Sequence, residues 1–134
     1  MCFSKLKNIV SKIKPCGTID EHLAASILLD KLEEMNCKAE IYLPDAKMKV
    51  YNKEDVKKFL SLDEIDSILY VAEEMDCDDF AAELFAKFAG IIWTNTHAFN
   101  WFISGNEELF FVEPQNDKIS QTLESWDIRF FLGR

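Results

Sequence analysis

Three residues of the types used in thiol catalysis follow one another along the chain: Cys77, His97 and Glu113. A cysteine, a histidine and a carboxylate can act as nucleophile, general base and orienting group. The 134 residues contain only four cysteines and two histidines, so few other combinations exist. The sequence therefore predicts a Cys–His–Glu triad in which the sulfur of Cys77 attacks.

A helix is predicted to position the cysteine. Cys77 begins a stripe of apolar residues at helical spacing that continues through Phe80, Leu84 and Phe88. Unpaired backbone amides and the positive end of the helix dipole favour a thiolate in the first turn. The same amides are suited to hold a developing oxyanion.

A hairpin is predicted to bring the other two residues together. Two strand-like runs, 93–103 and 109–113, are joined by a turn signal at 104–106. A hairpin that turns there places His97 opposite Glu113 or one position away from it. Contact between the base and its orienting carboxylate then follows from the strand pairing.

Aspartates surround the predicted nucleophile. Asp76, Asp78 and Asp79 flank Cys77, and their negative charge would raise the pKa of its thiol. Capping of the helix explains them, and so does binding of a divalent cation, which would reverse the effect on the thiol. Both interpretations stay open.

Each triad member also has a common structural role. Cys77 fits a core cysteine, His97 fits a hydrogen-bonded strand histidine, and a glutamate before proline is ordinary. Asn100 is an alternative orienting group, but strand alternation turns its side chain to the other face. The order of the three residues and their predicted elements favour the functional interpretation.

The remaining cysteines and histidine are expected to have no catalytic role. Cys2, Cys16 and Cys37 are irregularly spaced, and the chain has no Cys-x-x-Cys pair, so a structural zinc site is not expected. An even cysteine count permits disulfides, yet no export signal is seen, which favours reduced thiols in the cytoplasm. His22 lies in a polar helical turn with no partner nearby in sequence.

Charge and hydropathy exclude two classes of protein. The formal net charge of −9 opposes binding to the phosphate backbone of a nucleic acid. No apolar run approaches the roughly 20 residues that span a bilayer. The length predicts a single domain, and 49% hydrophobic residues are enough for one core.

The other segments complete an α+β pattern, with helices in the first half and a small antiparallel sheet packed on the Cys77 helix. They are a basic amphipathic helix at 3–14, a helix opened by a capping box at 18–21 and ending near 36, two extended pieces within 38–51, a short helix capped by Asn52, an acidic irregular stretch at 61–75, a helix C-cap at Gly90 and a strand at 126–132.

Three motifs together resemble a known group. The runs at 76–81 (DCDDFA), 97–101 (HAFNW) and 113–115 (EPQ) are similar to the papain-like C-terminal domain of the mushroom galactose-binding agglutinins and its small prokaryotic and phage relatives. The similarity extends over about 39–116. A related succession of motifs occurs in the wider transglutaminase-like group, which supports the fold more than the substrate.

This resemblance implies one papain-like domain over 1–134, with N-terminal helices in 1–37 and the core in 38–134. It implies a cysteine protease in which Cys77 is the nucleophile, His97 the base and Glu113 the orienting group. It also implies activation by calcium or a similar divalent cation, with Asp78 and Asp79 as metal candidates and Asp76 less directly so. The chain lacks the agglutinin's lectin domain, so sugar targeting is not implied.

The expected function is a cytoplasmic thiol hydrolase acting on peptide or isopeptide amides of a peptide or protein substrate. The alternative is a papain-like binding module without catalytic turnover, favoured by the acidic surroundings of Cys77. Transfer of the acyl group to an amine, in place of hydrolysis, is a third option. The sequence leaves the substrate, the metal and the oligomeric state open.

Overall fold

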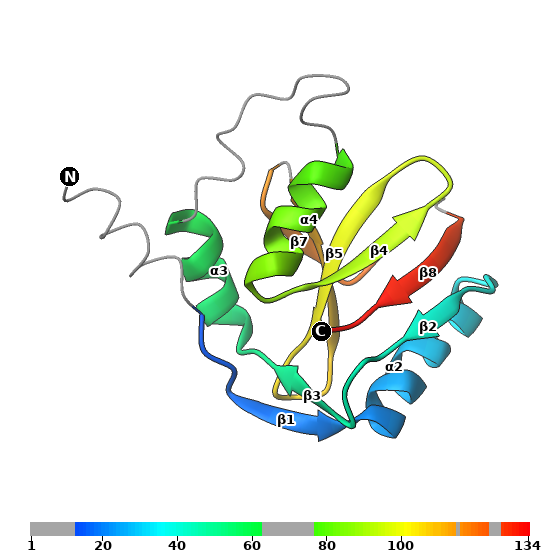
Figure 1. Cartoon of the computed structure of the whole chain (residues 1–134), viewed down its shortest axis with the longest axis horizontal. Coiled ribbons are helices and arrows are strands. Elements are labelled where there is room, and N and C mark those ends of the chain that lie inside the picture. Colours follow the sequence, from blue (N-terminus) through cyan, green and yellow to red (C-terminus); the bar gives the residue numbers. More distant parts are fainter. Residues whose placement is uncertain (1–12, 63–76, 115, 124–126) are drawn as a thin grey trace.

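The computed structural model describes residues 13–62, 77–114, 116–123 and 127–134, and of residues 77–79 it describes the backbone only. The described residues form helices and strands in a confirmed α+β arrangement (Figure 1). In chain order these are β1 (Gly17–Asp20), α2 (Glu21–Glu34), β2 (Glu40–Tyr42), β3 (Lys47–Val50), α3 (Lys53–Leu62), α4 (Cys77–Lys87), β4 (Gly90–Thr94), β5 (Ala98–Ile103), β6 (Leu109–Glu113), β7 (Lys118–Ser120) and β8 (Ile128–Leu132). Among the described helices, none has the length and apolar character needed to cross a membrane.

Six strands form one mixed sheet in the order β2-β8-β4-β5-β6-β7. β2 and β8 run parallel, whereas the other neighbouring pairs are antiparallel, so the prediction of a purely antiparallel sheet is wrong. β1 and β3 form a separate antiparallel pair. The two extended pieces predicted within 38–51 are therefore confirmed as β2 and β3, but they pair with other strands and not with each other.

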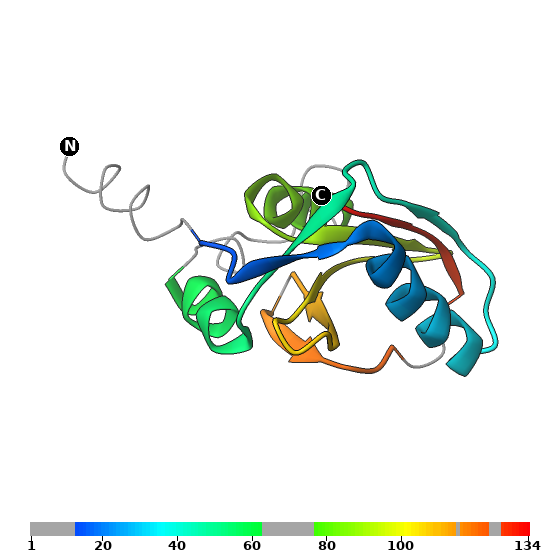
Figure 2. The same cartoon turned by 90° about the horizontal axis from the view of Figure 1, so that it is seen from below.

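The six-stranded sheet lies between α2 on one face and α4 on the other (Figure 2). Side chains along β5 alternate between the two cores, as strand geometry requires. Phe99 and Trp101 pack in the core that contains α2. Phe102 packs in the core that contains α3 and α4, and the amide of Asn100 bonds to α4. The position of a residue along β5 therefore decides whether its side chain faces α2 or α4.

Polar side chains fix the starts of two helices. Asn52 accepts a hydrogen bond from the backbone N–H of Glu54 at 2.9 Å, which confirms the predicted cap of α3. Asp20 caps α2 by accepting from the N–H of His22 at 2.8 Å. The predicted capping box is wrong by two residues, because Thr18 is held in β1 by its pairing with β3.

The strand predicted at 93–103 is divided in two by a turn at 95–97, and its first half begins earlier, at Gly90. Gly90 is therefore a strand residue and does not cap α4. The ring of the fully buried Trp101 lies against it, so a Cβ at this position would be 2.4 Å from Cε2 of Trp101. Glycine is required here for close packing.

The spacing in the strand predicted at 126–132 places Trp126, Ile128, Phe130 and Leu132 on one side, and for the described part of this strand that prediction is wrong. Ile128 and Phe131 are the buried residues of β8, at 2% and 0% exposure. The pairing of β4 with β8 shifts register between Trp93 and Thr94, which adds one residue to β8 and breaks the period of two.

Two predicted segments fall largely outside the described residues. These are the amphipathic helix at 3–14, of which residues 1–12 are not described, and the acidic stretch at 61–75, of which 63–75 are not described. The second predicted N-terminal helix is confirmed as α2, with Ala24, Leu28 and Leu32 buried.

Candidate functional site

His97 and Glu113 form a direct side-chain pair. Nε2 of His97 lies 2.7 Å from Oε2 of Glu113, and the two side chains are 16% and 19% exposed. His97 immediately precedes β5, and Glu113 is the last residue of β6. Because β5 and β6 are antiparallel, these two positions lie at the same end of the sheet. The predicted contact between base and carboxylate is present.

The strand pairing that produces the contact differs from the predicted one. Asn100 pairs with Val112, so Glu113 continues the ladder opposite Phe99 and not opposite His97. His97 precedes Phe99 by two residues and so reaches Glu113 along the diagonal of one sheet face. The contact survives this shift because diagonal neighbours on one face remain within reach of long side chains.

Thr94 holds the backbone of His97 in place. This buried hydroxyl accepts a hydrogen bond from the N–H of His97 at 2.8 Å and donates one to its carbonyl at 2.9 Å. The N–H of Thr94 donates to the same carbonyl at 2.9 Å. Hydrogen bonds from the side chain and the backbone of Thr94 therefore close the turn between β4 and β5. They fix the backbone position from which the His97 side chain extends.

The imidazole is also oriented by an aromatic neighbour. The rings of His97 and Phe99 meet edge to face, with centroids 4.3 Å apart. With Nε2 engaged by Glu113, exchange of a proton with a thiol would use Nδ1 of His97. These contacts orient the imidazole on the face of the sheet that carries Phe99 and α2.

The backbone places Cys77 near this end of the sheet. Cys77 is the first residue of α4, as predicted, and lies one helical turn before Ala81. Ala81 clusters with Ala98, the neighbour of His97 in the chain. In Figure 1 the start of α4 and the start of β5 lie at the same end of the sheet.

The buried amide of Asn100 fastens α4 to the sheet. Its Nδ2 donates to the carbonyl of Ala81 at 2.9 Å and to that of Gly90 at 3.0 Å, while Oδ1 is buried without a partner among the described residues. Asn100 faces α4, whereas His97 and Glu113 share the opposite face of the sheet with Phe99, so Asn100 does not compete with Glu113 for contact with His97. The sequence predicted which face of the sheet the Asn100 side chain occupies. It did not predict the hydrogen bonds to Ala81 and Gly90, because these bonds join three separate elements.

An aspartate at this position should make stability depend on pH. In Asn100→Asp the carboxyl is buried beside two carbonyl oxygens, which raises its folded pKa above the unfolded value of roughly 3.9. Unfolding free energy should then fall above about pH 4, by at most roughly 1.4 kcal/mol per pH unit, until the folded pKa is reached. Urea unfolding at pH 3 to 7 measures this. Asn100→Leu has no titrating group, and an identical pH profile for the two variants would contradict the burial argument.

The metal candidates fall on residues whose side chains are not described. Asp76 lies outside the described residues, and Asp78 and Asp79 are described by backbone only, within the first turn of α4. The described part of the chain contains no group of three or more side chains suited to hold a metal ion.

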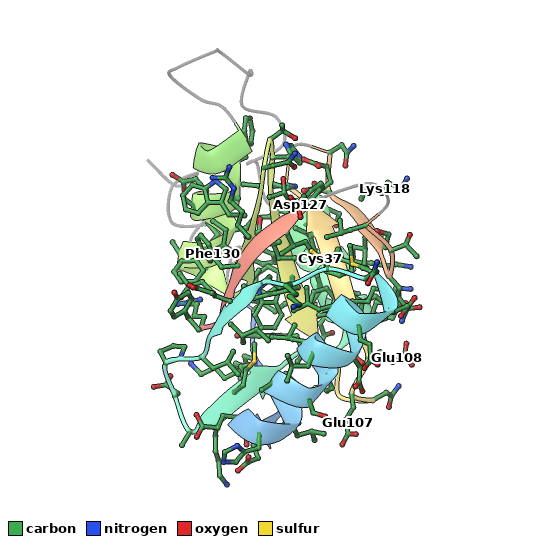
Figure 3. All side chains as sticks on the ribbon, turned by 90° about the vertical axis from the view of Figure 1, so that its right-hand side faces the viewer. Cys37, Glu107, Glu108, Lys118, Asp127 and Phe130 are labelled. Carbon is green, nitrogen blue, oxygen red and sulfur yellow. The ribbon has the colours of Figure 1, made fainter. Side chains whose placement is uncertain are left out.

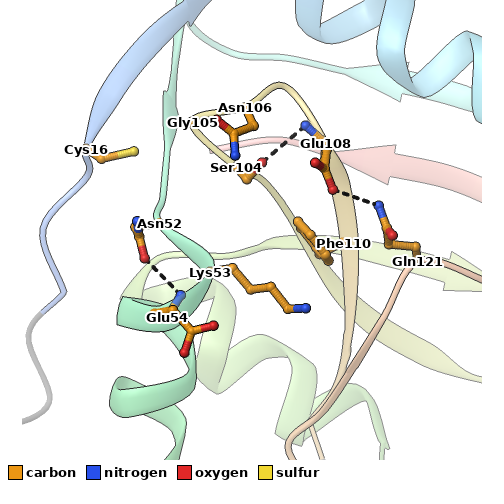
Figure 4. Close-up of a pocket in the computed structure, with 10 residues that line it drawn as sticks. All are labelled: Cys16, Asn52, Lys53, Glu54, Ser104, Gly105, Asn106, Glu108, Phe110 and Gln121. Carbon is orange, nitrogen blue, oxygen red and sulfur yellow. Dashed lines mark hydrogen bonds between the residues drawn. The ribbon is translucent and has the colours of Figure 1, made fainter.

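Two cavities lie at opposite ends of the β5–β6 hairpin. One, of about 440 Å³, adjoins the pair and is lined by Glu113, Phe99 and Lys118 among others. The other, of about 320 Å³, surrounds the hairpin turn and includes Cys16 and Lys53 (Figure 4). Only the first is continuous with the candidate site.

No protein-family model and no curated protein matches this chain. Several solved structures match this chain. The PSL1a–E64 complex superposes with a TM-score of 0.70 at 22% identity, covering 86% of this chain and 50% of that one. Polyporus squamosus lectin bound to the human-type influenza-binding epitope Neu5Aca2-6Galb1-4GlcNAc superposes with a TM-score of 0.71 at 21% identity, covering 86% and 49%.

These comparisons establish a shared fold. The chain has the fold of about half of a mushroom agglutinin, which agrees with the resemblance seen in the three sequence motifs. This chain spans about half the length of the lectin chains it matches.

Proposed function

We propose that this chain is a papain-like thiol hydrolase that acts on peptide or isopeptide amides through Cys77, His97 and Glu113. The observation that carries the proposal is the 2.7 Å contact between Nε2 of His97 and Oε2 of Glu113. It lies at the end of the sheet where α4 begins with Cys77.

In this scheme Nδ1 of His97 accepts the proton of the Cys77 thiol, and the thiolate attacks the amide carbonyl. Glu113 keeps Nε2 protonated and stabilises the imidazolium. The imidazolium then gives its proton to the leaving amine, and water or a second amine takes the acyl group from sulfur. Backbone N–H groups in the first turn of α4 are suited to hold the oxyanion.

A divalent cation, calcium by the resemblance, fits this scheme through Asp78 and Asp79, with Asp76 less directly involved. Bound beside the start of α4, it would offset the repulsion between these carboxylates and a thiolate at Cys77.

The E64 complex of one structural neighbour supports thiol chemistry in this fold. E64 carries an epoxide that alkylates cysteine thiolates. The other neighbour is a glycan complex of the same Polyporus squamosus lectin; it supports a different function, and by itself it favours binding over hydrolysis. The His97–Glu113 contact is the reason for placing hydrolysis first, because a glycan-binding surface does not require an oriented imidazole.

Labelling by E64 tests the proposal. Wild-type protein should gain one E64 adduct by intact mass spectrometry, and Cys77→Ala should gain none. Cys37→Ala is the matched control, since Cys37 is a free, partly buried thiol elsewhere, and it should label like wild type. Repeating the experiment with calcium and with a chelator tests the cation. Equal labelling of wild type and Cys77→Ala would rule out Cys77 as the nucleophile.

The second candidate is a binding module of the same fold that has no turnover. Its support is the glycan-bound neighbour. In that case Cys77 should show an ordinary thiol pKa of roughly 8.5 in an alkylation titration. Calorimetric titration with the same trisaccharide should then give saturable binding that Cys77→Ala leaves unchanged.

A further inference from the structure

β2 lies at one edge of the six-stranded sheet, and within the described residues no strand pairs with its outer side. The carbonyl of Tyr42 accepts a hydrogen bond from the N–H of Gly133 at 2.7 Å, so the polar backbone groups of Tyr42 face β8. Because these groups alternate between the two edges of a strand, the N–H and C=O of Ile41 point outward. Such an edge can template a further strand.

An apolar groove accompanies this edge on the face that carries α2. It has a volume of about 480 Å³, with Ala39, Ile41 and Leu43 contributed by β2 and its flanks and with Ala25 and Leu29 contributed by α2. Figure 3 shows β2 and α2 side by side at this edge. Leu29 is 55% exposed, so apolar surface here remains in contact with solvent. A strand added to β2 would direct every second side chain into the groove.

The opposite face of the same edge is aromatic and acidic. The rings of Tyr42, Phe130 and Trp93 form a row across β2, β8 and β4, with centroids 6.1 Å and 5.5 Å apart. Tyr42 is 51% exposed and Trp93 is 37% exposed. The hydroxyl of Tyr42 donates to the carboxylate of Glu40, and this bond raises the pKa of Tyr42. The carboxylate is therefore anchored beside an exposed ring.

We propose that β2 is a docking edge for an extended peptide segment of a partner protein, in which apolar and basic side chains alternate. The peptide backbone pairs with the N–H and C=O of Ile41. Its apolar side chains enter the groove beside Leu29, and its basic side chains lie over Tyr42 and next to Glu40. This is strand addition with a separate side-chain preference on each face.

Charge selects this occupant over the alternatives. Glu40 stands on one face and Glu21 lines the end of the groove on the other, in a chain of net charge −9. A cation gains both from a carboxylate and from the face of an aromatic ring. A second copy of this chain would bring its own negative charge to the edge and would be repelled. A neutral sugar has no charge that these carboxylates could attract.

The test uses a short capped peptide that alternates leucine and arginine, added to the full chain. Hydrogen exchange should show slower exchange of the Ile41 amide at saturation, because that N–H becomes paired. Two modified peptides test which contacts the binding uses. Replacing arginine by glutamate, or methylating the peptide nitrogens that face β2, should each weaken binding roughly tenfold or more, about 1.4 kcal/mol.

A pair of variants locates the binding. Leu29→Glu should weaken binding by the leucine–arginine peptide roughly tenfold, whereas Leu62→Glu should not, although Leu62 on α3 is equally exposed at 54%. Equal effects of the two variants, equal binding of the methylated peptide, or unchanged exchange at Ile41 would overturn the proposal. So would concentration-dependent dimerisation that protects Ile41 without peptide, or protection by the sialylated trisaccharide alone. None of these results depends on Cys77.

Discussion

Replacing His97 by alanine is expected to slow alkylation of Cys77 by E64 roughly 100-fold at pH 6. A thiol with an ordinary pKa of roughly 8.5 is ionised to only about 0.3% at that pH, whereas a thiolate paired with an imidazolium is largely ionised. The wild-type rate should be nearly constant from pH 6 to 8. The His97→Ala rate should rise about tenfold per pH unit over that range.

The chain supplies a matched control for this experiment. His22 is the only other histidine, and it lies exposed on α2, away from the sheet end that carries Glu113. His22→Ala should therefore follow the wild-type profile. A wild-type rate that itself rises tenfold per pH unit would mean that the His97–Glu113 pair does not activate the thiol, and it would favour the binding module.

Replacing Gly90 by alanine is expected to destabilise the fold by about 3 kcal/mol. The added Cβ would lie 2.4 Å from both Cε2 and Nε1 of Trp101, a ring with no exposed surface. That ring cannot move away freely, because its Nε1 donates to the carbonyl of Ile91 at 3.2 Å and the ring makes an edge-to-face contact with Phe131. The thermal midpoint should fall by roughly 10 °C.

Gly17 provides the comparison for Gly90→Ala. A Cβ there would meet only Val50, at 3.8 Å, which is an ordinary contact. Gly17→Ala should therefore change unfolding free energy by less than about 0.5 kcal/mol. Similar losses in the two variants would mean that the effect comes from strand glycines in general and not from the Trp101 ring.

Local patterns were sufficient to predict the parts of the site that depend on neighbouring residues. The apolar stripe beginning at Cys77 predicts where α4 starts, and a turn signal at 104–106 predicts the β5–β6 hairpin. The His97–Glu113 contact follows from that hairpin even though the register is shifted, because both side chains lie on one face.

Features that depend on packing between segments far apart in the chain could not be predicted from the sequence. Gly90 resembles a helix cap until the ring of Trp101, eleven residues later, is placed against it. The parallel pairing of β2 with β8 joins residues 90 positions apart in the chain, and no turn signal marks it. The hydroxyl of Thr94 looks like any strand threonine until the turn closes around it and binds His97.

The position of β8 has a consequence for biosynthesis. β8 is the last described strand along the chain, yet it lies between β2 and β4. A nascent polypeptide that has not yet emerged as far as Ile128 cannot join β2 to the rest of the sheet, and the edge of β4 that pairs with β8 stays open. Such an intermediate exposes a bare strand margin next to unfilled core, the condition in which growing chains need chaperone protection from aggregation.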